Sequence, residues 1–305
     1  MNSASIISIK RGRRRGVISE KIIENLFLSA SVITVLAVLV IIFTLVSESL
    51  SFFLQISPRE FFLGTQWTAF FEDRSFGVLP LLSGTILTST IALLFAVPTG
   101  VGSAIFLSEY SSERVRRIVK PTLEVLAGIP TVVYGYFALY FITPNLRTFI
   151  PDISIFNALS AGLAVGVMIL PTVASLSEDA IYAVPQNLKE VAYALGGRKV
   201  DAIVRVIIPY ALPAILSAII IAMARVIGET MIVTIAAGLK PSLTLNPFES
   251  VMTMTAAIAQ AATGDAPHGT VQYSSLFAVG TYLFVIVMIL NSMSHLIRLR
   301  WSIKL

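Results

Sequence analysis

The sequence contains no cysteine and only two histidines among its 305 residues. The absence of cysteine excludes disulfides, thiolate metal sites, iron–sulfur clusters and cysteine nucleophiles. His268 and His295 lie too far apart for the paired-histidine motif of zinc hydrolases. Charged residues are also scarce, at 13% of the chain against about 25% in soluble domains. Because so little charge cannot cover a water-soluble chain of this size, the composition excludes an ordinary soluble enzyme and an intrinsically disordered protein.

The sequence instead contains long runs of apolar residues. Hydrophobic residues make up 56% of the chain, and a membrane-spanning helix needs about 20 apolar residues in succession. Six stretches approach or meet this requirement, at 26–46, 79–107, 125–142, 155–176, 210–237 and 273–297. The sequence therefore predicts an all-α, polytopic membrane protein with six transmembrane helices.

The positions of Lys and Arg predict how these helices are oriented. With both termini in the cytosol, 17 Lys and Arg residues fall in cytosolic segments and 4 in outer segments, as the positive-inside rule requires. The basic cluster at 10–15 precedes the first span, which explains the net charge of +5 without nucleic acid as a partner. The first apolar run is too long for a cleaved signal peptide, so we expect an uncleaved membrane anchor.

The longest segment assigned to the cytosol, 177–213, has the pattern of a helix, a turn and a second helix. Pro185 suits the start of the first helix because that position needs no backbone N–H donor. Gly196 can end this helix, since glycine accepts the left-handed conformation of a C-cap. The second helix, 199–208, is expected to end at Pro209. Such a loop offers an apolar knob to a partner, and the alternative is a packed hairpin with no coupling role.

One apolar span carries two charged residues, Arg225 and Glu229. In an unbroken helix, residues four apart lie on the same face. Each charge costs about 2.5–3.5 kcal/mol at the centre of a membrane helix, so this face is expected to meet protein or water. A guanidinium suits phosphate or carboxylate oxygens, while Glu229 would hold Arg225 in place or neutralise it until an anion displaces it. The pair indicates an anion pathway or, alternatively, an ion pair that locks the span against a neighbouring subunit.

Other residues in the spans allow both a functional and a structural interpretation. Pro98, Pro130 and Pro171 interrupt three spans, which suits the wall of a pathway as well as ordinary packing. Hydroxyl side chains in the second span either line a polar path or bond to their own helix. Gly162 and Gly166 form a G-x-x-x-G pattern, which predicts close helix packing.

The loop at 177–213 resembles the EAA loop of ABC-importer permease subunits. The resemblance is carried by Glu190, Ala192, Gly196 and Pro209 at the family's spacing, with Val191 in place of the middle alanine. It implies that this loop docks on a separate ATPase subunit. Because the chain has no Walker motif, ATP and magnesium would be bound by that partner. No cofactor is therefore expected in this chain, which would be a transport subunit and not an enzyme.

A narrower resemblance covers about 75–297. The segment 224–230, A-R-V-I-G-E-T, is similar to a segment of phosphate importer permeases, and 126–135 looks like the matching part of the PstC-type subunit. The resemblance implies a type I ABC-importer permease fold in the inner membrane and import of inorganic phosphate by alternating access. The substrate pathway would include Arg225, Glu229 and Thr230. The implied partners are a PstA-type permease, two PstB-type ATPase subunits and an extracytoplasmic PstS-type phosphate-binding protein.

These expectations divide the chain into five segments. They are a basic cytosolic N-terminus (1–25), a transmembrane anchor (26–47), an extracytoplasmic loop (48–78), a permease core with its EAA loop (79–297) and a cytosolic tail (298–305). Aromatic residues in 48–78 favour the membrane interface, with docking of a solute-binding protein as the alternative. The rival functions are a permease for sulfate or molybdate, a secondary anion transporter, and a membrane scaffold without transport.

Overall fold

The computed structural model describes residues 3–267 and 269–301, and nearly all regular structure in these ranges is helical. The helices are α1 (Ser3–Phe53), α2 (Pro58–Leu63), α3 (Leu79–Ile105), α4 (Glu113–Ala127), α5 (Thr131–Phe137), α6 (Thr143–Phe149), α7 (Ala158–Tyr182), α8 (Gln186–Ala194), α9 (Lys199–Ala202), α10 (Ile208–Ile227), α11 (Met231–Ala236), α12 (Met254–Gln260) and α13 (Val271–Trp301). Four π-helical turns adjoin them, at Phe106–Tyr110, Ala138–Ile142, Ile203–Ile207 and Ala261–Asp265. The predicted all-α class is confirmed.

Within the described ranges, five helical segments are long and apolar enough to cross a membrane. They are Ile23–Phe53, Leu79–Tyr110, Ala158–Tyr182, Lys199–Ile227 and Val271–Ile297. A sixth crossing exists if Glu113–Ala127 and Thr131–Phe149, which are bent by 88° at their junction, count as one broken span. The third span predicted at 125–142 lies across this bend, at the proline that the sequence marked as an interruption. Pro130 explains the break, since proline disfavours helical conformation in the residue before it and has no N–H to donate.

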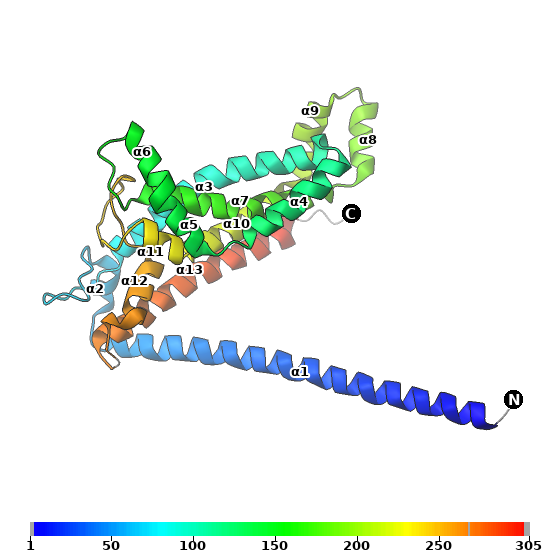
Figure 1. The fold of residues 1–305 in the computed structure, drawn as a ribbon, viewed down its shortest axis with the longest axis horizontal. Coiled ribbons are helices and arrows are strands. Elements are labelled where there is room, and N and C mark those ends of the chain that lie inside the picture. Colours follow the sequence, from blue (N-terminus) through cyan, green and yellow to red (C-terminus); the bar gives the residue numbers. More distant parts are fainter. Residues whose placement is uncertain (1–2, 268, 302–305) are drawn as a thin grey trace.

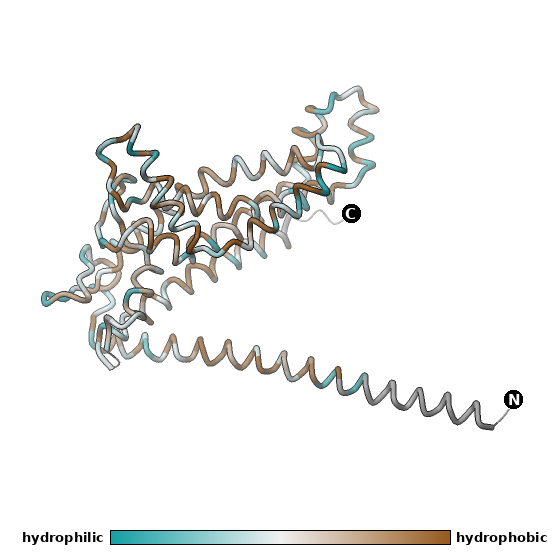
Figure 2. Tube along the Cα trace, in the orientation of Figure 1, coloured by the Kyte–Doolittle hydropathy of each residue, from teal (hydrophilic) through white to brown (hydrophobic). Residues whose placement is uncertain are grey.

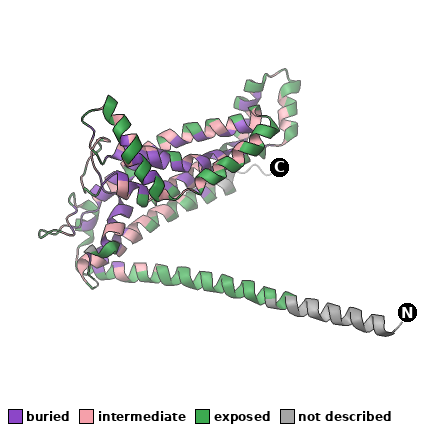
Figure 3. Ribbon diagram, viewed as in Figure 1, coloured by how far each residue is buried: buried purple, intermediate pink, exposed green. Residues whose placement is uncertain are grey.

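Helix α1 diverges from the rest of the bundle (Figure 1). Its last turns pack on α13, where the Thr281 hydroxyl donates to the carbonyl oxygen of Leu45 at 3.2 Å. Further toward its start, its apolar side chains are exposed (Figures 2 and 3). The side chains of the basic cluster at 10–15 lie outside the described residues, so its topogenic role remains a prediction.

Helices α3 and α7 pack closely against each other in the centre of the bundle. A Cβ added to Gly162 would lie 2.7 Å from the Cβ of Ile91, and one added to Gly166 would lie 3.0 Å from the carbonyl oxygen of Ala92. Because a larger side chain would force these helices apart, the close packing predicted from the G-x-x-x-G pattern is confirmed.

The hydroxyl groups of α3 bond mainly within their own helix. Thr88 donates to the carbonyl of Gly84, and Thr85 donates to that of Leu81, each at 2.8 Å. Thr85 also accepts the backbone N–H of Met254 at 3.0 Å, which joins α3 to the start of α12. Both threonines are buried. These two side chains therefore serve packing, as the structural alternative expected.

The segment between α1 and α3 folds over one end of the bundle, here called the α2 end. Phe52, Phe61, Trp67 and Phe76 are buried there. Phe52 makes edge-to-face contacts with Phe61 and Phe76, at centroid distances of 5.6 and 5.5 Å. The side chains of Phe52, Phe61 and Trp67 are therefore packed inside the protein, and the interface location expected for aromatic residues of this segment stays a prediction.

Candidate functional site

Helices α8 and α9 form a hairpin that projects from the end of the bundle opposite the α2 end (Figure 1). Pro185 precedes α8 as its N-cap, and Gly196 follows it with a φ of 81°. The Gly196 N–H bonds to the Tyr193 carbonyl at 2.9 Å and the Gly197 N–H to the Ala192 carbonyl at 3.1 Å. These two bonds define a Schellman C-cap. The predicted helix–turn–helix is confirmed, including its left-handed glycine.

The sequence predicted that the second arm of the hairpin, 199–208, ends at Pro209, and this prediction is wrong. Helix α9 passes through the π-helical turn Ile203–Ile207 directly into α10, so the chain is helical from 199 to 227. In this turn the N–H of Ile208 bonds to the carbonyl of Ile203, five residues back. Proline normally clashes with the carbonyl four residues before it, and the widened turn lies directly before Pro209. The hairpin is thus joined to α10 by continuous helix.

The base and the tip of the hairpin differ in burial. Near the base, Leu188 packs against an apolar cluster at this end of the bundle, whose buried members are Ala104, Ile181, Val184, Ile203, Ile207, Ala211 and Ile215. Toward the tip, Val191 and Leu195 are 57% and 83% exposed, and Glu190 and Gly196 are also exposed. The hairpin therefore presents an uncovered apolar tip, as the sequence predicted.

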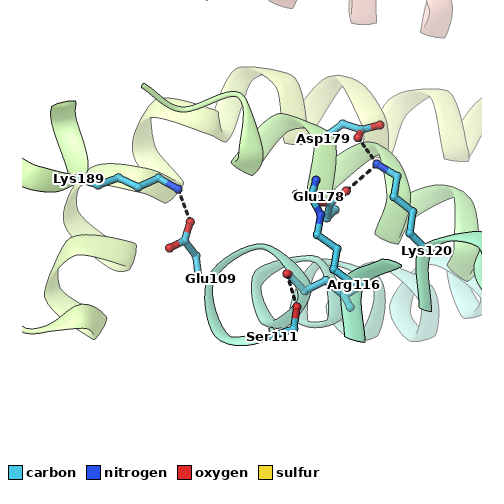
Figure 4. A network of polar contacts seen from close by, with 8 residues as sticks. Glu109, Ser111, Arg116, Lys120, Glu178, Asp179 and Lys189 are labelled. Carbon is cyan, nitrogen blue, oxygen red and sulfur yellow. Dashed lines mark hydrogen bonds and ion pairs between the residues drawn. The ribbon is translucent and has the colours of Figure 1, made fainter. Parts of the chain in front are cut away.

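An ion pair joins the hairpin to the end of α3. Lys189 Nζ on α8 lies 2.6 Å from Glu109 Oε1 in the turn that follows α3 (Figure 4). Both side chains are largely buried, with 12% and 7% exposure. Nearby, the Lys199 ammonium lies 4.7 Å from the centroid of the Tyr110 ring, a cation–π contact. Sequence reasoning missed Glu109 as an interaction partner because Lys189 is 80 residues away in the chain.

A second ion-pair cluster joins α4 to the end of α7. The Glu178 carboxylate, only 1% exposed, meets Arg116 Nη2 at 2.5 Å and Lys120 Nζ at 2.8 Å. Lys120 also pairs with Asp179 (Figure 4), and the Arg116 guanidinium lies 3.7 Å from the centroid of the Tyr182 ring. Because a buried carboxylate is stable only with compensating charge, these contacts hold the first half of the broken span against α7.

The structure separates Arg225 from Glu229. Helix α10 ends at Ile227 with Gly228 as its C-cap, and α11 begins at Met231. Glu229 Oε1 accepts the backbone N–H groups of Met231 and Ile232 at 3.1 and 3.2 Å. The expectation of one unbroken helix over 210–237 with both charges on one face is wrong. Among the described residues no ion pair joins the two. Glu229 instead accepts N–H groups at the start of α11, where a helix leaves its first N–H groups without a partner of its own.

Arg225 instead contacts α7. Its Nη1 donates to the Thr172 hydroxyl at 3.3 Å, and Thr172 directly follows Pro171 within α7. The side chain of Arg225 is exposed on a segment long and apolar enough to cross a membrane. Thr230 lies in the short break after α10, where its hydroxyl donates to the Gly228 carbonyl at 3.3 Å. Arg225, Glu229 and Thr230, the three predicted pathway residues, thus lie at or next to one helix break. Arg225 is the cationic residue among them.

The bundle has the fold of an ABC-importer permease. It matches a structure of the MetNI methionine ABC transporter in inward-facing conformations with a TM-score of 0.53 and 16% identity, over 72% of this chain and 94% of that chain. It matches the crystal structure of an amino acid ABC transporter with histidines with a TM-score of 0.51 and 21% identity, over the same shares of the two chains. These likenesses show the fold of the bundle.

The sequence profile of one family, described as binding-protein-dependent transport system inner membrane component, matches residues 96–302. The chain belongs to this family, and it is therefore a multi-pass inner-membrane permease and not an enzyme. The matched range includes both the hairpin and Arg225. His268, one of the two histidines too far apart for a paired-histidine motif, lies outside the described residues.

Several curated relatives cover most of the chain. A phosphate transport system permease protein PstC of Xylella fastidiosa is 32% identical over 88% of this chain and 89% of its own length. A protein of the same name from Mesorhizobium japonicum is 36% identical over 74% of each chain. The probable ABC transporter permease protein YqgH of Bacillus subtilis is 33% identical over 75% of this chain and 74% of its own length.

Proposed function

We propose that this chain is the PstC-type permease subunit of an ATP-driven importer of inorganic phosphate. The observation that carries the proposal is the similarity to PstC proteins, which extends over 88% of the chain in one case. A permease for sulfate or molybdate is the second candidate, because an arginine in a membrane-crossing helix attracts any small oxyanion.

In this proposal the hairpin docks on the ATPase. Glu190, Ala192, Gly196 and Pro209 shape the hairpin, and its exposed apolar tip enters a groove of a PstB-type subunit. Because this chain has no Walker motif, ATP and magnesium are bound by two such ATPase subunits. The hairpin end of the bundle then faces the cytoplasm. The start of α1 and the end of α13 lie toward the same end (Figure 1), which supports cytoplasmic N- and C-termini.

The anion passes beside Arg225 in the same proposal. Arg225 is exposed in the single chain, and its free face would turn toward a pathway shared with a PstA-type permease. Thr172 uses only one donor of the guanidinium, which leaves other donors for phosphate oxygens. Glu229 and Thr230 would shape the helix break at which the pathway narrows. A PstS-type binding protein would deliver phosphate to the α2 end, and membrane lipid would surround the apolar spans.

Competition between anions tests the substrate. Proteoliposomes with the assembled complex and its binding protein are expected to accumulate radiolabelled phosphate when ATP is supplied to the ATPase subunits. A large excess of unlabelled phosphate should nearly abolish uptake of the label by competition for the same site, whereas the same excess of sulfate or molybdate should leave it nearly unchanged. Accumulation of radiolabelled sulfate or molybdate in place of phosphate would favour the second candidate.

A further inference from the structure

The hairpin is attached to two different spans in two different ways. Its second arm continues as unbroken helix into α10, and its first arm is held to the end of α3 by the ion pair between Lys189 and Glu109. We propose that this ion pair transmits movement of the hairpin to α3, so that α3 and α10 shift together when the ATPase moves the hairpin. The inference rests on the proposed function and adds two positioning residues to it.

The geometry of the pair suits a mechanical link. Lys189 lies in the middle of α8, and Glu109 lies in the π-helical turn that directly continues α3, so each charge sits on a helical element. Their charged atoms are 2.6 Å apart, and both side chains are largely buried. Burial limits screening by salt, and separation of the pair would leave an uncompensated charge. The pair therefore resists separation more than an exposed ion pair would.

An open space adjoins the ion pair on one side of the hairpin. A cavity of about 490 Å³ lies between the hairpin and the bundle, and Glu109 and Lys189 both line it. The remaining lining residues are Ser108, Tyr182, Val184, Gln186, Tyr193 and Lys199. Leu188 on α8 packs on the apolar cluster that includes Ala104 of α3. On the side of the open space the connection is polar, and it consists of the ion pair and the Lys199–Tyr110 contact beside it.

The link leads by direct contact to the proposed anion pathway. Helix α3 packs on α7 at Gly162 and Gly166, where no larger side chain fits. Helix α7 carries Thr172, which contacts Arg225 on α10. Movement passed to α3 would therefore reach both helices that hold Arg225. Coupling is a free energy shared between two sites, so the test removes each charge and then exchanges the two.

The experiment measures phosphate uptake per ATP hydrolysed by the complete complex in proteoliposomes. Glu109→Gln and Lys189→Gln are each expected to retain the ATPase subunits and ATP hydrolysis but to lower this ratio at least about fivefold, the lower end of typical coupling between sites. Reversal of the pair, by Glu109→Lys together with Lys189→Glu, is expected to restore most of the ratio. The conservative Lys189→Arg variant should remain close to wild type.

An exposed ion pair of the same hairpin provides the matched control. Arg198 pairs with Asp201 at 3.1 Å, with 86% of the arginine and 33% of the aspartate side chain exposed, and solvent-screened pairs contribute little. The change to asparagine keeps an acceptor for the Arg198 backbone N–H, which Asp201 accepts at 3.2 Å. Asp201→Asn should therefore leave uptake per ATP unchanged. Three outcomes would overturn this inference but not the proposed function. They are an unchanged ratio of uptake to ATP hydrolysis in both single variants at Glu109 and Lys189, loss of the ATPase subunits from these variants, and failure of the reversed pair to restore transport. Absence of phosphate uptake by the wild-type complex would overturn the proposed function as well.

Discussion

The Gly196→Asp variant is expected to lose ATP-driven uptake while the chain still folds into the membrane. Gly196 has a φ of 81°, is exposed, and has no atom within 4 Å of an added Cβ. An L-residue in this left-handed conformation costs about 1–2 kcal/mol, and aspartate also places a charge beside the apolar tip. Binding of the ATPase subunit should weaken by more than about tenfold. Co-purification of the ATPase with the permease measures this directly.

A glycine outside the hairpin supplies a closely matched control. Gly269 has a φ of 79° and also has open space around it. Gly269→Asp therefore introduces the same backbone strain and the same charge far from the hairpin. This variant is expected to retain the ATPase subunits. Equal loss of the ATPase in both variants would show that strain, and not the hairpin surface, controls assembly.

The Arg225→Ala variant is expected to assemble with its partners but to transport phosphate at least about a hundredfold more slowly, equivalent to about 2.7 kcal/mol. The change removes the only described cationic side chain that contacts Thr172 on α7. Arg225→Lys should give an intermediate rate, because an ammonium keeps the charge but lacks the planar donors of guanidinium. Uptake rates and subunit co-purification, measured on the same preparations, separate transport from assembly.

Arg117 on α4 serves as the control for removal of an arginine. Its side chain is 79% exposed, and its ion pair with Glu113 is long, at 3.9 Å. Because such an exposed pair contributes little, Arg117→Ala should leave uptake unchanged. Wild-type uptake in both Arg225 variants would contradict a role in the pathway. Failure of the Arg225 variants to assemble would instead support the alternative in which Arg225 locks its span against a neighbouring subunit.

Much of the fold is predictable because its signals are local. Five of the apolar runs mark spans by composition alone, and the proline and glycine that flank α8 mark the hairpin. The sequence marked Pro130 as an interruption but did not predict the sharp bend there, and it missed the break at Gly228. Apolar residues continue through Gly128 and Pro130 in one span and through Gly228 in another. Because hydropathy varies little across these points, it does not show that the backbone turns there.

The ion pairs depend on tertiary packing and have no comparable local signal. Glu178 falls just beyond the predicted fourth span, and its partner Lys120 is 58 residues away. Only the extension of α7 to Tyr182 and its packing against α4 bring these charges together. The contact between Arg225 and Thr172 likewise joins residues 53 positions apart. Such contacts follow from which helices are neighbours, and that information is not contained in hydropathy or residue spacing.

The central claim is that a separate ATPase drives phosphate import through this chain. The most direct measurement is phosphate accumulation in proteoliposomes that contain this chain with its partner permease, ATPase subunits and binding protein, compared with proteoliposomes that contain this chain alone. Accumulation is expected only in the complete complex with ATP supplied to the ATPase subunits, and it should stop when ATP is replaced by a non-hydrolysable analogue. Phosphate accumulation by this chain alone without ATP, driven by an ion gradient, would contradict the claim.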